Sequence, residues 1–291
     1  AGLRNRLVNG AMAIDQEFAG ASTTFTAAAA LKYAIDQWYG YCTGANVTGQ
    51  RVAGTAPNQF NYQFTGAASV TKIGYAQRME AVNTQDLAGT TATLSVDLAN
   101  TLLTTVTWTA WRANTADTFG TLASPTRTQI GTGTFTVTST LTRYSAQITV
   151  TAASITGIEV EFSVGAQTSG TFTIGRAQLE QGSTATAFES TRPFSLELLL
   201  CQRYFWALPA GVNFQFACPS TGGFAHTFTV QLPIRMRATP TIVAGYGATS
   251  NVTTLGTPSA TTECVQVQIT GTIAANSSAV LNSMTATARI P

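Results

Sequence analysis

The chain has 291 residues, of which 44% are hydrophobic and only 10% are charged, and its formal net charge at pH 7 is +2. This composition excludes a disordered chain, which combines low hydrophobicity with high charge, and the lack of a basic run argues against nucleic acid as a ligand. The longest apolar stretch, around residues 198–200, is far shorter than the ~20 residues that cross a bilayer. We therefore expect a soluble protein of one or two folded domains, without membrane insertion or an export signal.

Alternation of apolar and polar residues predicts many short strands. In residues 91–103, Leu94, Val96 and Leu98 alternate with polar neighbours, and residues 156–165 show the same period of two. Similar segments at 134–139, 142–151, 170–180, 226–236 and 263–273 are separated by turn residues. Short strands at this spacing predict an all-β chain of sandwich or barrel domains.

Helical periodicity is clear only after Pro193. Ser195 is a candidate N-cap, and the residues that share one helical face are Leu196, Leu199, Leu200, Arg203 and Tyr204. A helix this short needs a packing partner, either its own sandwich or other copies of the chain, and the hinge-like composition before it favours the copies. We predict a β domain over residues 1–190, a helical connector over 191–206 and a smaller β domain over 207–291.

The residues needed for common catalytic sites are missing. The only histidine, His226, shares its alternation with Phe228 and fits a core or interface position, and the four cysteines lack metal-site spacing and fit buried thiols. No phosphate-binding or nucleophile motif occurs. Glu159 and Glu161 share one strand face, where like-charged neighbours on a solvated surface are the ordinary explanation. The sequence does not predict an enzyme.

Aromatic residues next to polar ones indicate a sugar-binding site, because pyranose rings stack on aromatic faces while polar side chains bond the hydroxyls. Two clusters qualify, and the candidate glycan-binding residues are Trp38, Tyr39, Tyr41, Trp111 and Arg112. Trp108 and Trp111 are an odd number of residues apart and should face opposite sides of a strand. A core position remains the alternative for each tryptophan.

Four segments share a more specific pattern. They are "NRLVNGAMAIDQ" (5–16), "IDQW" (35–38), "AQLEQGSTATAFESTRPFSLELLLCQRYF" (177–205) and "VQLPIRMRATPTI" (230–242). They resemble segments of bacteriophage and prophage virion proteins, a group of tail fibres, head spikes and related appendages that extends to gene-transfer-agent-like particles. The resemblance covers both ends of the first domain and one segment of the last.

The resemblance implies a carbohydrate-binding-module-like jelly roll that attaches a particle to bacterial surface or capsular polysaccharide. It also implies a homotrimer, with Leu196, Leu199, Leu200 and Tyr204 near the threefold axis, other virion proteins as partners, and assembly into the virion in the bacterial cytoplasm. Such jelly rolls often hold a structural calcium ion, for which Asp15 and Glu180 are the candidate ligands, although calcium needs six to eight oxygens.

Two rival functions remain open at this point. A purely structural virion adaptor or decoration protein would use the same jelly roll to contact another virion protein. A polysaccharide depolymerase is the third class, and the lack of an evident acid pair or of a β-helix repeat argues against it. Host-cell attachment through a head spike or tail fibre is the function that the sequence favours.

Overall fold

The structure, a computed structural model, describes residues 3–28, 30–189, 192–208, 211–218, 223–272 and 276–290. The chain divides into two compact units, residues 1–197 with 290–291 and residues 198–289. The expected domain boundary between residues 190 and 191 lies outside the described residues.

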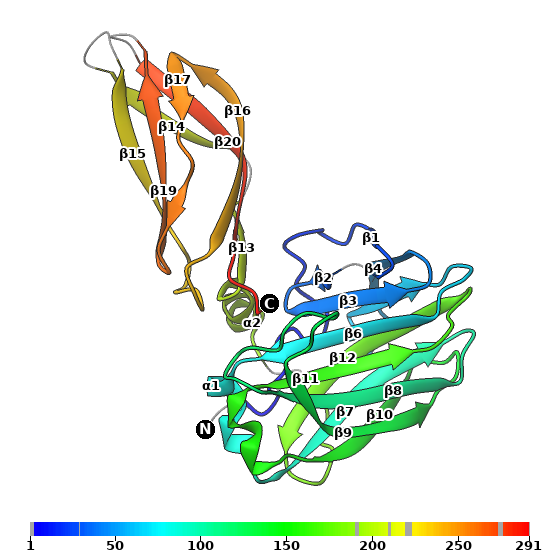
Figure 1. Ribbon diagram of the computed structural model, residues 1–291. Helices are drawn as coiled ribbons and strands as arrows, with labels where there is room; N and C mark the ends of the chain where they lie inside the picture. Colours follow the sequence, from blue (N-terminus) through cyan, green and yellow to red (C-terminus); the bar gives the residue numbers. More distant parts are fainter. Residues whose placement is uncertain are drawn as a thin grey trace. The chain divides into compact units, whose positions relative to one another are not determined.

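The first unit is a sandwich of two six-stranded antiparallel sheets (Figure 1). Sheet A has the order β1 (Thr23–Phe25), β4 (Val47–Ala53), β5 (Phe60–Thr65), β12 (Thr171–Gln181), β7 (Thr91–Asn100) and β10 (Thr142–Thr149). Sheet B has the order β2 (Lys32–Ile35), β3 (Trp38–Thr43), β6 (Lys72–Met79), β11 (Ile158–Val164), β8 (Thr105–Ala113) and β9 (Arg127–Thr136).

The chain passes repeatedly from one sheet to the other, which is the jelly-roll arrangement. Three short helical segments, α1 (Ala81–Thr84), η1 (Gln85–Leu87) and η2 (Ala152–Thr156), lie in the connections. The predicted fold class is therefore confirmed for the first unit.

The alternating residues of the strands meet in one apolar core between the sheets. On β7, Leu94, Val96 and Leu98 are completely buried, as their period of two predicts. Aromatic rings fill the centre. Trp38 and Tyr62 each stack on the ring of Tyr75, with ring centroids 5.0 Å apart in both pairs. Burial of such large rings gives this core much of its stability.

A nine-residue helix, α2 (Phe194–Gln202), lies within residues 191–206, where the connector is predicted, and the boundary between the two units, after residue 197, falls inside it. It begins at Phe194, so Ser195 lies in its first turn and is not its N-cap as predicted. The backbone N–H of Glu197 already bonds the carbonyl of Pro193. Cys201 is the buried residue of α2, and Phe194 is 63% exposed.

The second unit is a smaller sandwich of two four-stranded sheets. In the first, β20 (Asn276–Thr287) pairs with β13 (Phe205–Leu208), β14 (Val212–Ala217) and β16 (Thr241–Ser250). In the second, β19 (Cys264–Gly271) pairs with β15 (Phe224–Gln231), β17 (Val252–Leu255) and β18 (Ser259–Ala260).

His226 of the second unit is half-buried among aromatic rings. Its ring stacks on Phe216, with centroids 5.2 Å apart, and lies 4.6 Å from the ring of Phe228. This agrees with the packing role that its alternation suggests. Among the described residues, no helix has the length and apolar character needed to cross a membrane.

Candidate functional site

A cleft of about 700 Å³ opens on the outer face of sheet B. Its lining includes Tyr41 and Thr43 of β3, Lys72 of β6, Glu161 of β11, Trp111 of β8, Arg127 of β9, and the loop residues Thr121, Leu122 and Ala123. The size falls within the range of about 300–1,000 Å³ that is usual for small-molecule sites. Five neighbouring strands and two loops thus supply the cleft, the second loop through Ala28 and Ala30 between β1 and β2.

Strand register explains why these side chains share a face. Glu159 lies opposite Arg78 on one neighbouring strand and opposite Trp111 on the other. Glu161, two residues along, must point to the same side. Because directly paired residues project from the same face of a sheet, the charged residues of β6 and β11 and the Trp111 ring gather outside the apolar core.

Two buried carboxylates lie on the outer face of sheet B, and one of them, Glu161, lines the cleft. Glu159 is fully buried and forms ion pairs with Arg78, at 2.7 Å from Nε to Oε2, and with Arg127. Glu161 is 3% exposed and accepts hydrogen bonds from Tyr41, at 2.6 Å, and from the Lys72 ammonium group, at 2.9 Å. The expected solvated face for these glutamates is wrong, because arginine, lysine and tyrosine groups surround them.

The ring of Tyr41 is held across the sheet. Gly74 lies beneath it, and a Cβ atom added to Gly74 would lie 2.2 Å from Cε1 of the ring, so only glycine leaves room for this position. Burial, followed by the negative charge of Glu161, raises the pKa of Tyr41. The hydroxyl therefore stays protonated at neutral pH and donates to the carboxylate.

A loop forms one wall of the cleft. Arg78 anchors it, because Nη2 donates a 3.0 Å hydrogen bond to the carbonyl of Gly120 and the guanidinium group lies 5.3 Å from the ring centroid of Phe119. Thr121 and Ala123, just beyond this anchor, are exposed at the rim. An aromatic ring, a lysine, a carboxylate and a threonine hydroxyl around one cavity can together bind a polyhydroxylated ligand.

Two predicted glycan-binding residues, Tyr41 and Trp111, line the cleft. Trp108 faces the core, as the odd spacing from Trp111 predicts, and is 6% exposed. Arg112 lies opposite Ile158, a core residue of β11, and so projects from the face that does not carry Trp111. Arg112 is therefore not part of the cleft.

Trp38 and Tyr39 are also excluded as ligand contacts, because both are 0% exposed. Trp38 stacks in the core and donates from Nε1 to the carbonyl of Asn9. Tyr39 lies on the outer face of sheet B, but its ring packs against the Arg78 guanidinium group, 5.2 Å from the ring centroid, and against the ring of Tyr33, with centroids 6.1 Å apart. The core alternative was thus the correct one for Trp38.

The two candidate calcium ligands do not fit a calcium site. Asp15 accepts the backbone N–H groups of Phe18 and Gly20, one on each carboxylate oxygen. In the described part of the chain, no three His, Cys, Asp or Glu residues gather closely enough to hold a metal. Asp15 orders a turn, a role that already uses the oxygens a cation would need.

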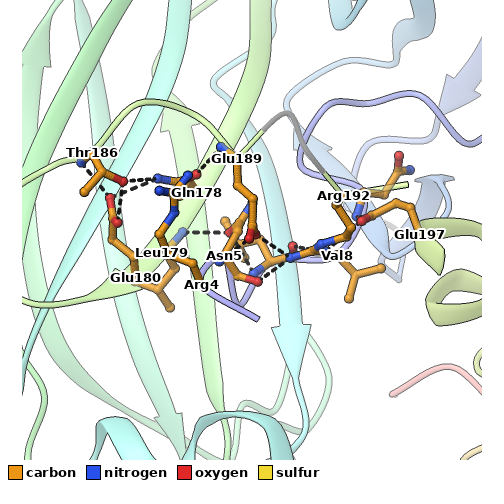
Figure 2. A network of polar contacts seen from close by, with 12 residues as sticks. Arg4, Asn5, Val8, Gln178, Leu179, Glu180, Thr186, Glu189, Arg192 and Glu197 are labelled. Atoms are coloured by element: carbon orange, nitrogen blue, oxygen red, sulfur yellow. Dashed lines mark hydrogen bonds and ion pairs between the residues drawn. The ribbon is translucent and has the colours of Figure 1, made fainter. Parts of the chain in front are cut away.

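Glu180 instead fixes the segment that follows β12. One carboxylate oxygen accepts the Thr186 N–H and the Gln178 side-chain amide, and the other accepts the Thr186 hydroxyl (Figure 2). Burial alone would raise the pKa of Glu180, but these hydrogen bonds and the charge of Arg4 outweigh it and lower the pKa. Both oxygens of this carboxylate therefore have partners within the chain.

Figure 2 also shows that the two ends of the first unit are joined by the residues that carry the virion-protein resemblance. The side-chain oxygen of Asn5 accepts the N–H groups of Leu7 and Leu179. Arg192 donates to the carbonyl of Asn5 at 2.6 Å and pairs with Glu197 at 2.7 Å. These motif residues close the sandwich and do not line the cleft.

The predicted oligomerisation residues have different surroundings. Leu196 and Leu199 are 38% and 37% exposed, and Leu200 is half-buried. Tyr204 is 3% exposed within its own chain, and its carbonyl accepts the N–H of Ala288. Tyr204 is thus covered within its own chain, whereas Leu196 and Leu199 are exposed, and the placement of these residues at an axis between chains stays a prediction.

Sequence reasoning missed Lys72, Arg127 and Thr121 as cleft residues. Arg127 belongs to the strand that pairs with β8, and its guanidinium carbon lies 4.5 Å from the ring centroid of Trp111. Glu161 was noticed only as part of an acidic pair. The alternating pattern of β11 predicts on which face of the strand Glu161 lies. Its cationic partners come from other strands, so they depend on the strand order of the sheet.

No protein-family model and no curated protein sequence matches this chain. Among solved structures, it is similar to the carbohydrate-binding module TmCBM61 in complex with beta-1,4-galactotriose (12% identity, 62% of this chain and 100% of that one, TM-score 0.39). It is also similar to the CBM22-1 xylan-binding domain from Paenibacillus barcinonensis Xyn10C (12% identity, 57% of this chain and 98% of that one, TM-score 0.34). A third similar structure is the enzymatically active domain of bacteriophage CBA120 tailspike protein 4 (14% identity, 62% of this chain and 22% of that one, TM-score 0.35). At these identities and TM-scores the similarity identifies neither a family nor a ligand for this chain.

Proposed function

We propose that the first unit binds a glycan in the cleft on sheet B and does not cleave it. The observation that carries this proposal is the Tyr41 ring, which lies over Gly74 and is tied to Glu161 beside an open cavity. An aromatic ring held in place offers a stacking surface for a pyranose ring without loss of side-chain freedom on binding.

Polar groups around Tyr41 supply the directional contacts. The Lys72 side chain is 43% exposed and can turn a donor toward a sugar hydroxyl while its ammonium group stays near Glu161. Thr121 offers a hydroxyl group from the rim. A single site of this kind is weak, and several linked copies in one particle would raise the avidity by about 10²- to 10⁴-fold.

The charge network supports binding without hydrolysis. A glycosidase needs one carboxylic acid that can give up a proton and a second carboxylate that acts as nucleophile or base. Arg78 and Arg127 surround Glu159, while Lys72 and Tyr41 hold Glu161. Both carboxylates are thus already bonded to side chains of the sheet, so neither is free to act on a bound sugar in the way that a glycosidase requires.

The finer proposal is that the chain belongs to a virion appendage, a head spike or tail fibre, that attaches a phage or phage-like particle to bacterial surface polysaccharide. The resemblance of residues 5–16 and 177–205 to virion proteins supports it. In this proposal other virion proteins hold the chain, and a homotrimer is built around the exposed apolar residues Leu196 and Leu199.

The test measures how much of the fluorescently labelled full chain binds to encapsulated bacterial strains and to their capsule-deficient derivatives. Binding that depends on the capsule and is lost in Tyr41→Ala supports the glycan function. A structural adaptor is the rival, favoured by the 63% exposure of Phe194 on α2, which suits a protein contact. Equal or absent binding to both members of each strain pair would favour the adaptor.

A further inference from the structure

A second cavity, of about 450 Å³, lies on the outer face of sheet A, away from the cleft residues. We propose that this groove binds a carboxylate-bearing sugar, such as a uronic acid residue, and that Arg176 is its anion-binding group. The polar and charged side chains that line it include Asn58, Asn61, Asp97, Thr140, Arg143 and Arg176. The groove is large enough for a sugar residue, since small-molecule sites start at about 300 Å³.

A bulge in β12 turns Arg176 into this groove. Phe172 and Ile174 point into the core, so strict alternation would bury residue 176 as well. The register with β7 shifts between Gly175 and Gln178, and Ala177 takes the core position instead. The backbone of Arg176 has a φ of +38°, a conformation that side-chain-bearing residues rarely adopt. Bulges and strained residues of this kind are typical of functional sites, where they re-aim one side chain.

The guanidinium group of Arg176 makes a hydrogen bond within the chain through only one of its three nitrogens, as far as the described residues show. Its Nε donates to Oδ2 of Asp97 at 2.5 Å, and the side chain is 20% exposed. Within the described part of the chain, no residue bonds its two terminal nitrogens. These two parallel donors match the two oxygens of a carboxylate.

The charges of the groove favour an anion. Asp97, 2% exposed, also pairs with Arg143, at 3.1 Å between Nη1 and Oδ1. The groove lining therefore carries two guanidinium groups and one carboxylate, which leaves one positive charge without a counterpart.

The neutral part of the groove offers amide groups to hydroxyls beside apolar residues such as Pro57 and Leu141. Asn58 donates to Asn61 at 2.8 Å, and both amides are buried against the sheet at the groove. They lie close to Gly175, where a Cβ atom would come within 2.2 Å of the Asn61 side-chain oxygen. No aromatic residue is among the described residues that line this groove, in contrast to the cleft. Recognition through an arginine and hydrogen bonds points to an acidic sugar.

The test compares binding of D-galacturonate and of D-galactose to the full chain by isothermal titration calorimetry or by ligand-observed NMR. We expect galacturonate to bind at least tenfold more tightly than galactose. Thr140→Trp should weaken galacturonate binding by tenfold or more, because Thr140 is exposed at the groove and the larger ring would block it. Arg176→Lys keeps the charge but not the paired donors, and should also weaken binding.

Two matched tryptophan variants make the result specific. Thr149→Trp, at an exposed position of β10 outside both cavities, should leave galacturonate binding unchanged. Ala123→Trp blocks the cleft on sheet B and should also leave it unchanged. Equal binding of galactose, or loss of galacturonate binding in Ala123→Trp but not in Thr140→Trp, would overturn the proposal. The proposal that the cleft on sheet B binds a glycan is tested separately, by the binding of polysaccharide, so the two proposals can fail independently.

Discussion

The guanidinium carbon of Arg127 lies 4.5 Å from the ring centroid of Trp111, so the arginine covers the indole at the floor of the cleft. The same guanidinium group forms ion pairs with Glu159 and, at 3.6 Å, with Glu161. Arg127 thus pairs with two buried carboxylates and packs on the indole ring of Trp111.

Removal of Arg127 should therefore destabilise the first unit strongly. Breaking a buried ion pair by deleting one partner typically costs about 3–5 kcal/mol when the remaining charge is left without a partner. Because Arg78 still pairs with Glu159 and Lys72 with Glu161 when Arg127 is removed, we expect a loss at the lower end of that range. We expect Arg127→Ala to lower the free energy of unfolding by this amount in urea denaturation. Arg6→Ala is the control, since Arg6 pairs with the 51% exposed Asp86 and surface pairs contribute about 0–1 kcal/mol. Equal losses in both variants would contradict this view of the network.

Gly74 should be required for the position of Tyr41. A methyl group at residue 74 would overlap the Tyr41 ring, so Gly74→Ala should lower the free energy of unfolding by about 1–3 kcal/mol through overpacking. In a Tyr41→Ala background the same change should cost less than about 0.5 kcal/mol, because the obstacle is gone. A double-mutant cycle in urea measures the difference. Equal costs in the two backgrounds would mean that the ring does not lie over Gly74.

The loop after β12 should weaken in acid. The pKa of Glu180 in the folded chain lies below its ordinary value of 4.5, so its contribution to stability is present above pH 4.5 and is lost as the pH falls through the lower folded value. We expect the melting temperature of the native chain to fall more steeply below pH 4.5 than that of Glu180→Gln. Asp86→Asn, at an exposed carboxylate, serves as control. Parallel curves for the native chain and Glu180→Gln would remove Glu180 from this account.

The trimer proposal predicts that a charge on α2 separates the chains. Leu199 is 37% exposed within one chain, so Leu199→Asp should leave the fold of each unit intact while burial of the new carboxylate between copies becomes unfavourable. Sedimentation should show a trimer for the native chain and a monomer for the variant, with unchanged circular dichroism. A native chain that is already monomeric at micromolar concentration would refute the trimer.

The strands were predictable because local alternation decides which residues face the core. Leu94, Val96 and Leu98 are buried as expected, and Trp108 and Trp111 lie on opposite sides of β8. The site was predictable only in part. The sequence indicates Tyr41 and Trp111, but gives no sign that the Arg78 guanidinium group would lie over the ring of their neighbour Tyr39.

The remaining site residues depend on relations that local patterns do not contain. Arg127 meets Glu159 only because β8 and β11 are neighbours in the sheet and β9 follows β8 at its edge. Arg176 reaches the outer face of sheet A only because a bulge breaks the alternation of β12. Strand order and bulges arise from the packing of the whole sandwich, so the short-range periodicity cannot predict them.

The most direct measurement of the central claim is the affinity of the purified full chain for isolated bacterial capsular polysaccharide, by affinity electrophoresis, with two tryptophan variants beside it. Ala123→Trp fills the cleft from its exposed rim, and Thr149→Trp adds the same side chain at an exposed position outside the cleft. The account predicts at least a tenfold loss of affinity in Ala123→Trp and none in Thr149→Trp, with both variants folded. Retention of full affinity by Ala123→Trp, or no binding by the native chain to any polysaccharide tested, would contradict it.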